Sequence, residues 1–163
     1  MIRISEDVHS LAYALHPAIL EHLGLIEALK AECDRFSGLE KIPVNLRAQE
    51  ISEPIPRDVA LCFFRITQEA LRNVARHAQA SSVEVILRCL DGGLQIVIQD
   101  NGAGFDPAQH RSAATLGHAS MRQRVHLLNG ELDIESSAGH GTAIMAWVPL
   151  QEKRREPSAR SAG

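Results

Sequence analysis

Three polar residues, Glu69, Asn73 and His77, recur at every fourth position within the helical pattern of residues 58–78. Residues four apart lie along one side of an α-helix. A carboxylate, an amide and an imidazole in line are groups that hold metal ions and phosphates or move protons. Asn73 and His77 also continue an apolar stripe, where an unpaired buried amide costs about 1–3 kcal/mol. From this helix alone, an asparagine satisfied by nearby backbone is the simpler interpretation.

The two sides of this helix are predicted to differ in character. The apolar stripe begins with Val59, Ile66 and Ala70. The solvated side is expected to carry Arg65, Gln68, Arg72 and Arg76. This separation predicts an amphipathic helix that covers a core with one face.

A second polar residue interrupts an apolar pattern at the end of a predicted strand. In residues 94–100 the apolar side chains alternate, and Asp100 is in phase with them, so its carboxylate is expected on the core side. Gly102 and Gly104 follow closely, and glycines let the backbone turn sharply and approach a ligand. An ordinary Asp-Asn-Gly turn explains the same residues, and a lone pair of glycines is weak support for a site.

Two further glycine segments carry weaker signals. Leu116-Gly117-His118-Ala119-Ser120-Met121 is predicted to open a helix, whose free N–H groups favour phosphate. Gly139-His140-Gly141-Thr142 precedes the last strand and is at least a hairpin turn. Every helix has an N-terminus and every hairpin has a turn, so neither segment alone identifies a site.

The elements that must position these residues form an alternating order along the chain. Pro17 is expected to kink or end a first helix, residues 3–15, near His16. The pattern then predicts a helix through Ile26, Leu29, Cys33 and Phe36, a strand at 43–48, the helix at 58–78, strands at 82–90 and 93–100, a loop-like stretch at 101–117, a helix through Met121, Val125 and Leu128, strands at 131–136 and 142–150, and a disordered tail at 151–163. Helices on one face of a largely antiparallel sheet make an α+β two-layer sandwich.

Composition narrows the class of protein. The 163 residues are 45% hydrophobic, which suffices for one core. The net charge is −3, whereas a nucleic-acid-binding protein is expected to carry an excess of basic residues. No apolar run approaches the length of a membrane span and no signal-peptide segment is evident, so a cytoplasmic protein is expected. The three cysteines read as buried hydrophobes, and the eight histidines form no zinc motif.

Taken together, the order and spacing of the motifs are specific. EALRNVARH, DNGAGFD, LGHASM and GHGT resemble the N box and glycine boxes of the GHKL ATPases (gyrase B, histidine kinases, MutL). The sensor-kinase branch of nitrate/nitrite and oxygen sensors is the most similar, and LHPAILEHLGLIEAL resembles the second helix of its dimerisation domain. The resemblance covers about residues 5–150 and implies a Bergerat-type ATP site between sheet and helices.

The resemblance also implies roles for individual residues. Asn73 would ligate Mg²⁺ bridging the phosphates of ATP, and Glu69 would be a base-like or metal-organising carboxylate. His77 would lie near the phosphates. Residues 106–117 would form a mobile lid, and Gly117 at its end would also lie near phosphate. The adenine side would be formed by Asp100, accepting a hydrogen bond from the adenine amino group, together with Gly102, Gly104 and Thr142.

Two features depart from the family pattern. The lid typically ends in GLGL, whereas Thr115-Leu116-Gly117-His118 stands here, which places phosphoryl transfer in more doubt than binding. The family's phosphorylated histidine precedes an acidic residue on an upstream helix, and His9, His16 and His22 do not match that pattern.

These features predict a division into a helical segment at residues 1–38, an ATP-binding catalytic domain at 39–150 and a tail at 151–163. The first hypothesis is a protein-histidine kinase module acting on a dimerisation helix in cis or in trans, with a response-regulator receiver domain as a further partner and homodimerisation through residues 3–36 as an option. The alternative is a non-catalytic nucleotide-binding or interaction module. An anti-sigma-type serine kinase of the same superfamily fits the N-terminal helix less well.

Overall fold

The computed structural model describes residues 3–51, 54–106 and 113–150, with side chains described at 18–51, 54–106 and 116–150. The predicted tail at 151–163 and residues 107–112 of the expected lid lie outside the described residues. The elements in chain order are α1 (Arg3–Glu40), β1 (Val44–Gln49), α2 (Arg57–Asn73), the π-helix η1 (Val74–Ala78), β2 (Val83–Leu90), β3 (Gly93–Asp100), α3 (Ala113–Leu127), β4 (Glu131–Ser136) and β5 (Thr142–Pro149). Among the described helices, none has the length and apolarity to cross a membrane.

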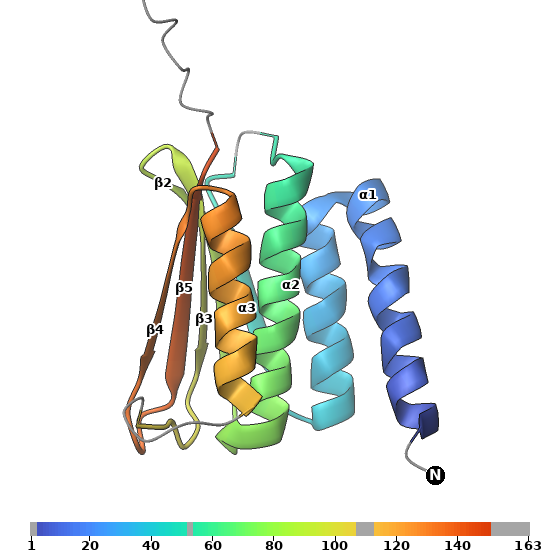
Figure 1. Ribbon diagram of the computed structural model, residues 1–163, viewed down its shortest axis with the longest axis vertical. Coiled ribbons are helices and arrows are strands. Elements are labelled where there is room, and N and C mark those ends of the chain that lie inside the picture. The colour runs from blue at the N-terminus through green and yellow to red at the C-terminus, as the bar shows by residue number, and fades with distance from the viewer. Residues whose placement is uncertain (1–2, 52–53, 107–112, 151–163) are drawn as a thin grey trace, which may run out of the picture.

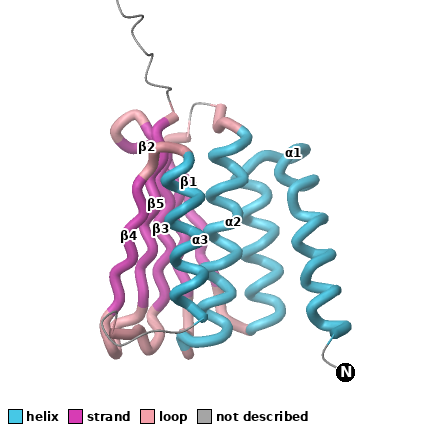
Figure 2. Tube along the Cα trace, in the orientation of Figure 1, coloured by secondary structure: helices cyan, strands magenta, loops and turns pink. Residues whose placement is uncertain are grey.

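The five strands form one sheet in the order β1-β2-β3-β5-β4. β1 pairs with β2 in parallel, and the other three pairings are antiparallel, as the largely antiparallel prediction requires. The helices cover one face of this sheet (Figures 1 and 2). Alternate residues such as Val85, Ile96 and Ala146 are fully buried beneath them, because successive side chains point to opposite faces of a strand. The predicted α+β two-layer sandwich is confirmed.

The first helix does not end where the sequence suggested. α1 continues through Pro17, and its helical geometry is broken instead at Gly24, with φ 83° and ψ 176°. The chain reverses direction at this point in Figure 1. A Cβ at Gly24 would meet no atom within 4 Å, so glycine is required by the backbone conformation and not by crowding. The expectation that Pro17 stops the helix was wrong.

The part of α1 beyond Gly24 belongs to the same core as α2 and the sheet. Leu25, Leu29 and Phe36 are buried in one apolar cluster with Phe63 and Phe64 of α2. The predicted apolar face of this helix is therefore confirmed at those positions. Cys33 and Cys62 are free and buried, and burial raises the pKa of Cys62 to about 11, so its thiol stays protonated and inert.

The long middle helix changes its winding before it ends. α2 gives way after Asn73 to the π-helix η1, which turns each residue through a smaller angle than an α-helix does. His77 is consequently exposed, and the prediction that it continues the apolar stripe was wrong. Gln68 was also misplaced: it is 6% exposed, and its Oε1 accepts a hydrogen bond from Arg65 at 2.9 Å.

The helix after the glycine-containing loop begins earlier than predicted. α3 begins at Ala113, so Leu116 and Gly117 lie inside it and not at its start. The N–H of Gly117 therefore falls within the helical hydrogen-bond pattern, because the unpaired N–H groups belong to the first turn. The predicted end near Asn129-Gly130 is confirmed, with the N–H of Gly130 donating to the Val125 carbonyl at 3.0 Å.

Truncation of Leu29 tests whether α1 beyond Gly24 is part of the core. Leu29 is fully buried, so Leu29→Ala should lower the free energy of unfolding by about 2–5 kcal/mol. Leu23→Ala is the matched control, because Leu23 is 64% exposed and its loss should change stability by less than about 0.5 kcal/mol. Urea unfolding measures both, and equal effects of the two variants would show that this helix does not share the core.

Candidate functional site

The polar residues singled out in the sequence gather at one end of the molecule. The end of α2 with η1, the end of β3 with the following loop, the start of α3 and the β4–β5 turn all lie at the lower end in Figure 1. The register supports this arrangement, since Asp100 at the end of β3 pairs with Thr142 at the start of β5. The fold therefore brings four segments, distant in sequence, to one place.

Asp100 is the buried carboxylate of this region. It is 6% exposed, and its Oδ1 accepts a hydrogen bond from the Gly102 N–H at 2.8 Å. Burial raises the pKa of Asp100, while hydrogen bonds from the backbone N–H groups of Gly102 and Thr142 oppose that shift. A carboxylate offers about four lone-pair positions, so capacity remains for another donor. The predicted placement of Asp100 on the core side is confirmed.

The glycines near Asp100 allow backbone segments to touch. A Cβ on Gly102 would collide with the Ala78 carbonyl oxygen, and one on Gly141 would collide with the carbonyl of Asp100. Gly104 has a φ of 61°, and a Cβ there would strike the carbonyl of Ser137. These glycines therefore join η1, the loop after β3 and the β4–β5 turn without intervening side chains.

Two residues that the sequence did not single out fasten this junction. The Asn101 Oδ1 accepts hydrogen bonds from the Ser81 and Ser82 N–H groups at 2.9 and 3.0 Å, which ties the loop to the start of β2. The Ser136 hydroxyl lies 2.9 Å from the Thr142 hydroxyl and accepts a hydrogen bond from the Phe105 N–H at 2.9 Å. Asn101 lies within the DNG motif and was recognisable as a turn residue, whereas Ser136 carries no sequence signal.

Glu69 and Gly117 meet across the two helices. A Cβ on Gly117 would overlap the Glu69 carboxylate, so the absence of a side chain on α3 makes room for this group. Glu69 also forms an ion pair with Arg72 one turn later, with 3.0 Å between Oε2 and Nη1. Of the sequence-predicted residues, the structure thus brings together Glu69 with Gly117, and Asp100 with Gly102 and Thr142.

An aromatic contact closes the space between the loop and α3. The rings of Phe105 and His118 are stacked, with centroids 5.6 Å apart and planes at 27°. Burial and the nearby Arg122 lower the pKa of His118, and Glu69 opposes this shift. The imidazole is therefore neutral at neutral pH and packs as a flat ring.

Asn73 has the least satisfied side chain in this region. Its Nδ2 atom is buried without a hydrogen-bond partner among the described residues. Such orphaned amides are rare in folded proteins, and the O and N positions of an amide are interchangeable by a flip. The Asn73 Nδ2 group is therefore a donor that a bound phosphate oxygen would satisfy, while His77 is exposed on η1.

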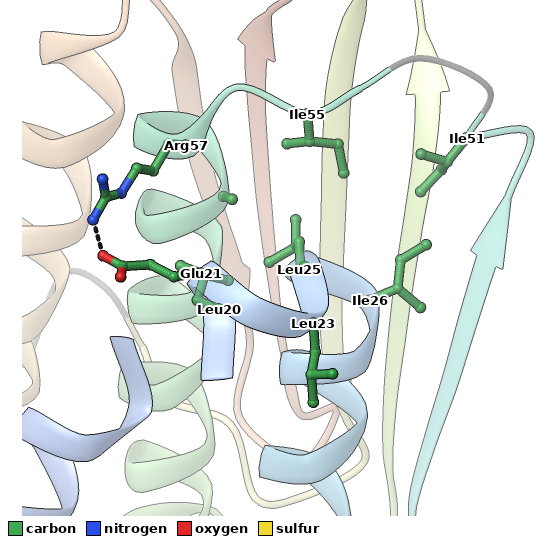
Figure 3. Close-up of a pocket in the computed structure, with 10 residues that line it drawn as sticks. Leu20, Glu21, Leu23, Leu25, Ile26, Ile51, Ile55 and Arg57 are labelled. Atoms are coloured by element: carbon green, nitrogen blue, oxygen red, sulfur yellow. Dashed lines mark ion pairs between the residues drawn. The ribbon is translucent and has the colours of Figure 1, made fainter. Parts of the chain in front are cut away.

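A separate cavity of about 560 Å³ lies at the opposite end of α2. Leu25, Ile51 and Ile55 line it, and an ion pair between Glu21 and Arg57 lies at its edge (Figure 3). It shares no lining residue with the site around Asp100. Its apolar walls carry none of the polar groups described above, so size alone does not mark it as the functional site.

Comparison with known families identifies the family to which the chain belongs. Residues 59–152 match the family described as the histidine kinase-, DNA gyrase B- and HSP90-like ATPases. The chain belongs to this ATPase family. The matched residues contain α2 from Val59 onward, the loop after β3, α3 and the β4–β5 hairpin, so every candidate site residue falls within them.

Individual relatives place the chain among sensor kinases. It is 34% identical over 144 residues to the signal transduction histidine-protein kinase/phosphatase DegS of Brevibacillus brevis, covering 88% of this chain and 37% of that protein. It is 30% identical over 152 residues to the oxygen sensor histidine kinase NreB of Staphylococcus carnosus, covering 93% of this chain and 44% of that protein. The chain thus spans less than half the length of these relatives.

Solved structures agree with this family assignment. The histidine kinase domain of a blue-light activated kinase from Erythrobacter litoralis superposes with a TM-score of 0.62 at 25% identity, covering 77% of this chain and 61% of that one. The histidine kinase AdeS of Acinetobacter baumannii shares the fold at a TM-score of 0.64 and 12% identity, covering 91% of this chain and 81% of that one. The resemblance to oxygen-sensor kinases predicted from the motifs is confirmed.

The pH dependence of stability tests the burial of Asp100. Because its pKa is raised in the folded state above the ordinary value of about 3.9, the native protein holds this proton more tightly than the unfolded chain. The stabilisation from the protonated Asp100 side chain is fully present at pH values below the ordinary pKa. It is lost as the pH rises through the raised pKa of the folded state. The advantage of wild type over Asp100→Asn should therefore shrink by up to about 1.4 kcal/mol per pH unit in this window. Urea unfolding between pH 3.5 and 7 measures it, and a growing advantage would contradict the assignment.

A double-mutant cycle tests the contact between Gly117 and Glu69. Gly117→Ala should destabilise the wild type, because the new methyl group displaces the Glu69 carboxylate. In a Glu69→Ala background the same change should be neutral or stabilising, since alanine favours a helix by about 1 kcal/mol over glycine. Urea unfolding of the four proteins gives the coupling energy, expected at about 1 kcal/mol or more. Independent effects of the two substitutions would show that the helices do not meet here.

Proposed function

We propose that this chain is the ATP-binding catalytic module of a two-component sensor histidine kinase. It would transfer the γ-phosphoryl group of ATP to a histidine on a dimerisation helix. One observation carries the proposal. The part of the chain that matches the ATPase family contains both a buried carboxylate, Asp100, and a buried amide without a hydrogen-bond partner, Asn73. Each polar group has a use if a nucleotide lies between them.

Asp100 would recognise the adenine ring. Its remaining lone pairs would accept a hydrogen bond from the adenine amino group, while the hydrogen bond from the Gly102 N–H fixes the position of the carboxylate. Thr142 supports the same side, because its backbone N–H donates to Asp100 and its hydroxyl contacts Ser136. Gly102 and Gly104 have no side chains, so the loop after β3 can pack directly against the neighbouring backbone.

Asn73 and Glu69 would act at the phosphate end. Asn73 would supply its amide oxygen to Mg²⁺, an ion that takes few protein ligands and completes its shell with phosphates and waters. Bound Mg²⁺ would neutralise phosphate charge during transfer. Glu69 would orient the metal shell or accept a proton, and Gly117 leaves room for its carboxylate.

The remaining assignments concern partners and boundaries. We place the acceptor histidine on a dimerisation helix outside these residues, and a response-regulator receiver domain after it in the relay, within the cytoplasm. His77 on exposed η1 would reach phosphate or solvent. The domain boundary is better placed at Gly24 than at residue 38, because Leu25, Leu29 and Phe36 already belong to the core.

A second function has a specific observation behind it. Glu69 is engaged by Arg72, and Gly117 lies within α3 and not at a helix start. Both features are compatible with a module that binds nucleotide without transferring phosphate. In that case the chain would report the nucleotide state to a partner through α1.

Calorimetry with ATP tests whether the chain has a nucleotide site, which both functions require. Wild type should bind ATP in a Mg²⁺-dependent manner, and Asp100→Asn should weaken binding by roughly a hundredfold, the effect of losing a charged hydrogen-bond partner. Asn73→Ala should abolish the Mg²⁺ dependence. Gln95→Ala is the matched control, since Gln95 is also on β3 but points to the other face of the sheet and does not line the cavity that contains Asp100.

Transfer is then measured with radiolabelled ATP and an added dimerisation-helix fragment from a related sensor kinase. Phosphorylation of its histidine, lost in Glu69→Ala and Asn73→Ala, would support the kinase. Binding without transfer to any acceptor would favour the non-catalytic module. No ATP binding by wild type would refute both.

A further inference from the structure

The face of the sheet turned away from the helices is not covered by any described element (Figures 1 and 2). Its side chains alternate with the buried ones, and none of its apolar members belongs to the core cluster. Ile86, Val97, Met145 and Trp147 are each half-buried on it. These four residues do not line the cavity that contains Asp100.

Charge is distributed unequally across the open face. Arg47 on β1 and Arg88 on β2 are exposed on one side, where Glu84 on β2 forms an ion pair with Arg47 at 3.2 Å. The opposite edge strand, β4, carries an exposed row of carboxylates from Glu131, Asp133 and Glu135. The face therefore runs from a side with two arginines and one glutamate, through apolar residues, to an acidic edge.

The strand register shows how these groups line up. In the middle row, Arg47 is paired with Ile86, Ile86 with Val97, Val97 with Met145, and Met145 with Asp133. The row thus places an arginine at one end, an aspartate at the other and three apolar side chains between them. β3, which carries Val97, is the central strand of the sheet.

The neighbouring row adds an aromatic ring. Trp147 lies opposite Gln95, which in turn lies opposite Arg88. The ring covers Gly93, where a Cβ would collide with it, and its Nε1–H donates to the Leu90 carbonyl at 2.9 Å. The indole is therefore fixed flat against the sheet and presents its face outward.

We propose that the open face binds a second copy of this chain through a two-fold axis parallel to β3. Such an axis lays β1 of one copy over β4 of the other and β2 over β5, because β3 is central. Arg47 then faces the partner's acidic Asp133 row, Ile86 faces Met145, and Val97 lies near the axis. Arg88 faces the Trp147 ring, a cation–π arrangement. A two-fold interface requires such self-complementarity, and two packed sheets lie about 10 Å apart.

The charge pattern favours a second copy over other occupants. A partner helix would have to match a basic side and an acidic side at once, whereas a second copy supplies both by symmetry. Five strands spaced about 4.8 Å apart and about 20 Å long give a face of roughly 500 Å² per copy. This area is below that of a standard stable interface, so the dimer is weak and its formation depends on concentration.

Sedimentation velocity of the full chain from 1 µM to 1 mM tests the dimer. Wild type should self-associate reversibly with a dissociation constant in the micromolar to millimolar range. Asp133→Arg should weaken association at least tenfold, because the new arginine of each copy then faces Arg47 of the other copy at both edges of the interface. Arg47→Asp together with Asp133→Arg should restore association to within about threefold of wild type. Trp147 is the single tryptophan of the chain, so its emission should shift to the blue as the dimer forms.

Arg124→Asp on α3 is the control, because it makes the same charge change as Arg47→Asp at an exposed position on the helical side. It should leave association unchanged, and circular dichroism confirms that each variant is folded. A monomer at every concentration would overturn the proposal. A dimer that ignores Asp133→Arg, as one formed through residues 3–36 would, also overturns it, as would failure of the double variant to recover.

Discussion

The candidate site depends on the close approach of three backbone segments at the end of β3. The Ala103 N–H donates to the Ala78 carbonyl at 2.6 Å, and the Ala103 carbonyl accepts from the Gly139 N–H at 2.5 Å. No side chain separates these segments, so the end of η1, the loop and the β4–β5 turn have little freedom to move independently. Asp100 lies next to this junction and is held by it, which fixes the direction of its carboxylate.

Local sequence patterns predicted the residues that depend on alternation within one strand. Asp100 could be assigned to the buried side because Leu94, Ile96 and Ile98 define the phase of β3. His77 could not be placed, because the change from α- to π-helix at Val74 alters the turn per residue and has no clear sequence signal. The phase of a helix is thus reliable only while its winding stays constant.

Contacts between distant segments were the main source of error. The sequence suggested that Pro17 would end α1, yet the break lies at Gly24, where the helix must turn so that Leu25 and Leu29 reach the core. Gly117 was expected at the start of a helix, but it lies inside α3 and against Glu69. In both cases tertiary packing decides between local options that a single sequence leaves open.

The departure of this chain from the family pattern at His118 has a physical explanation. The family resemblance places a leucine there, whereas this chain stacks an imidazole on Phe105. Burial and Arg122 lower the pKa of His118, so the ring is uncharged at neutral pH and packs much as an apolar side chain would. His118 therefore joins the loop to α3 through an uncharged ring contact, with the carboxylate of Glu69 nearby. The loop and α3 are thus in contact at the position of the altered motif, which is compatible with a formed nucleotide site.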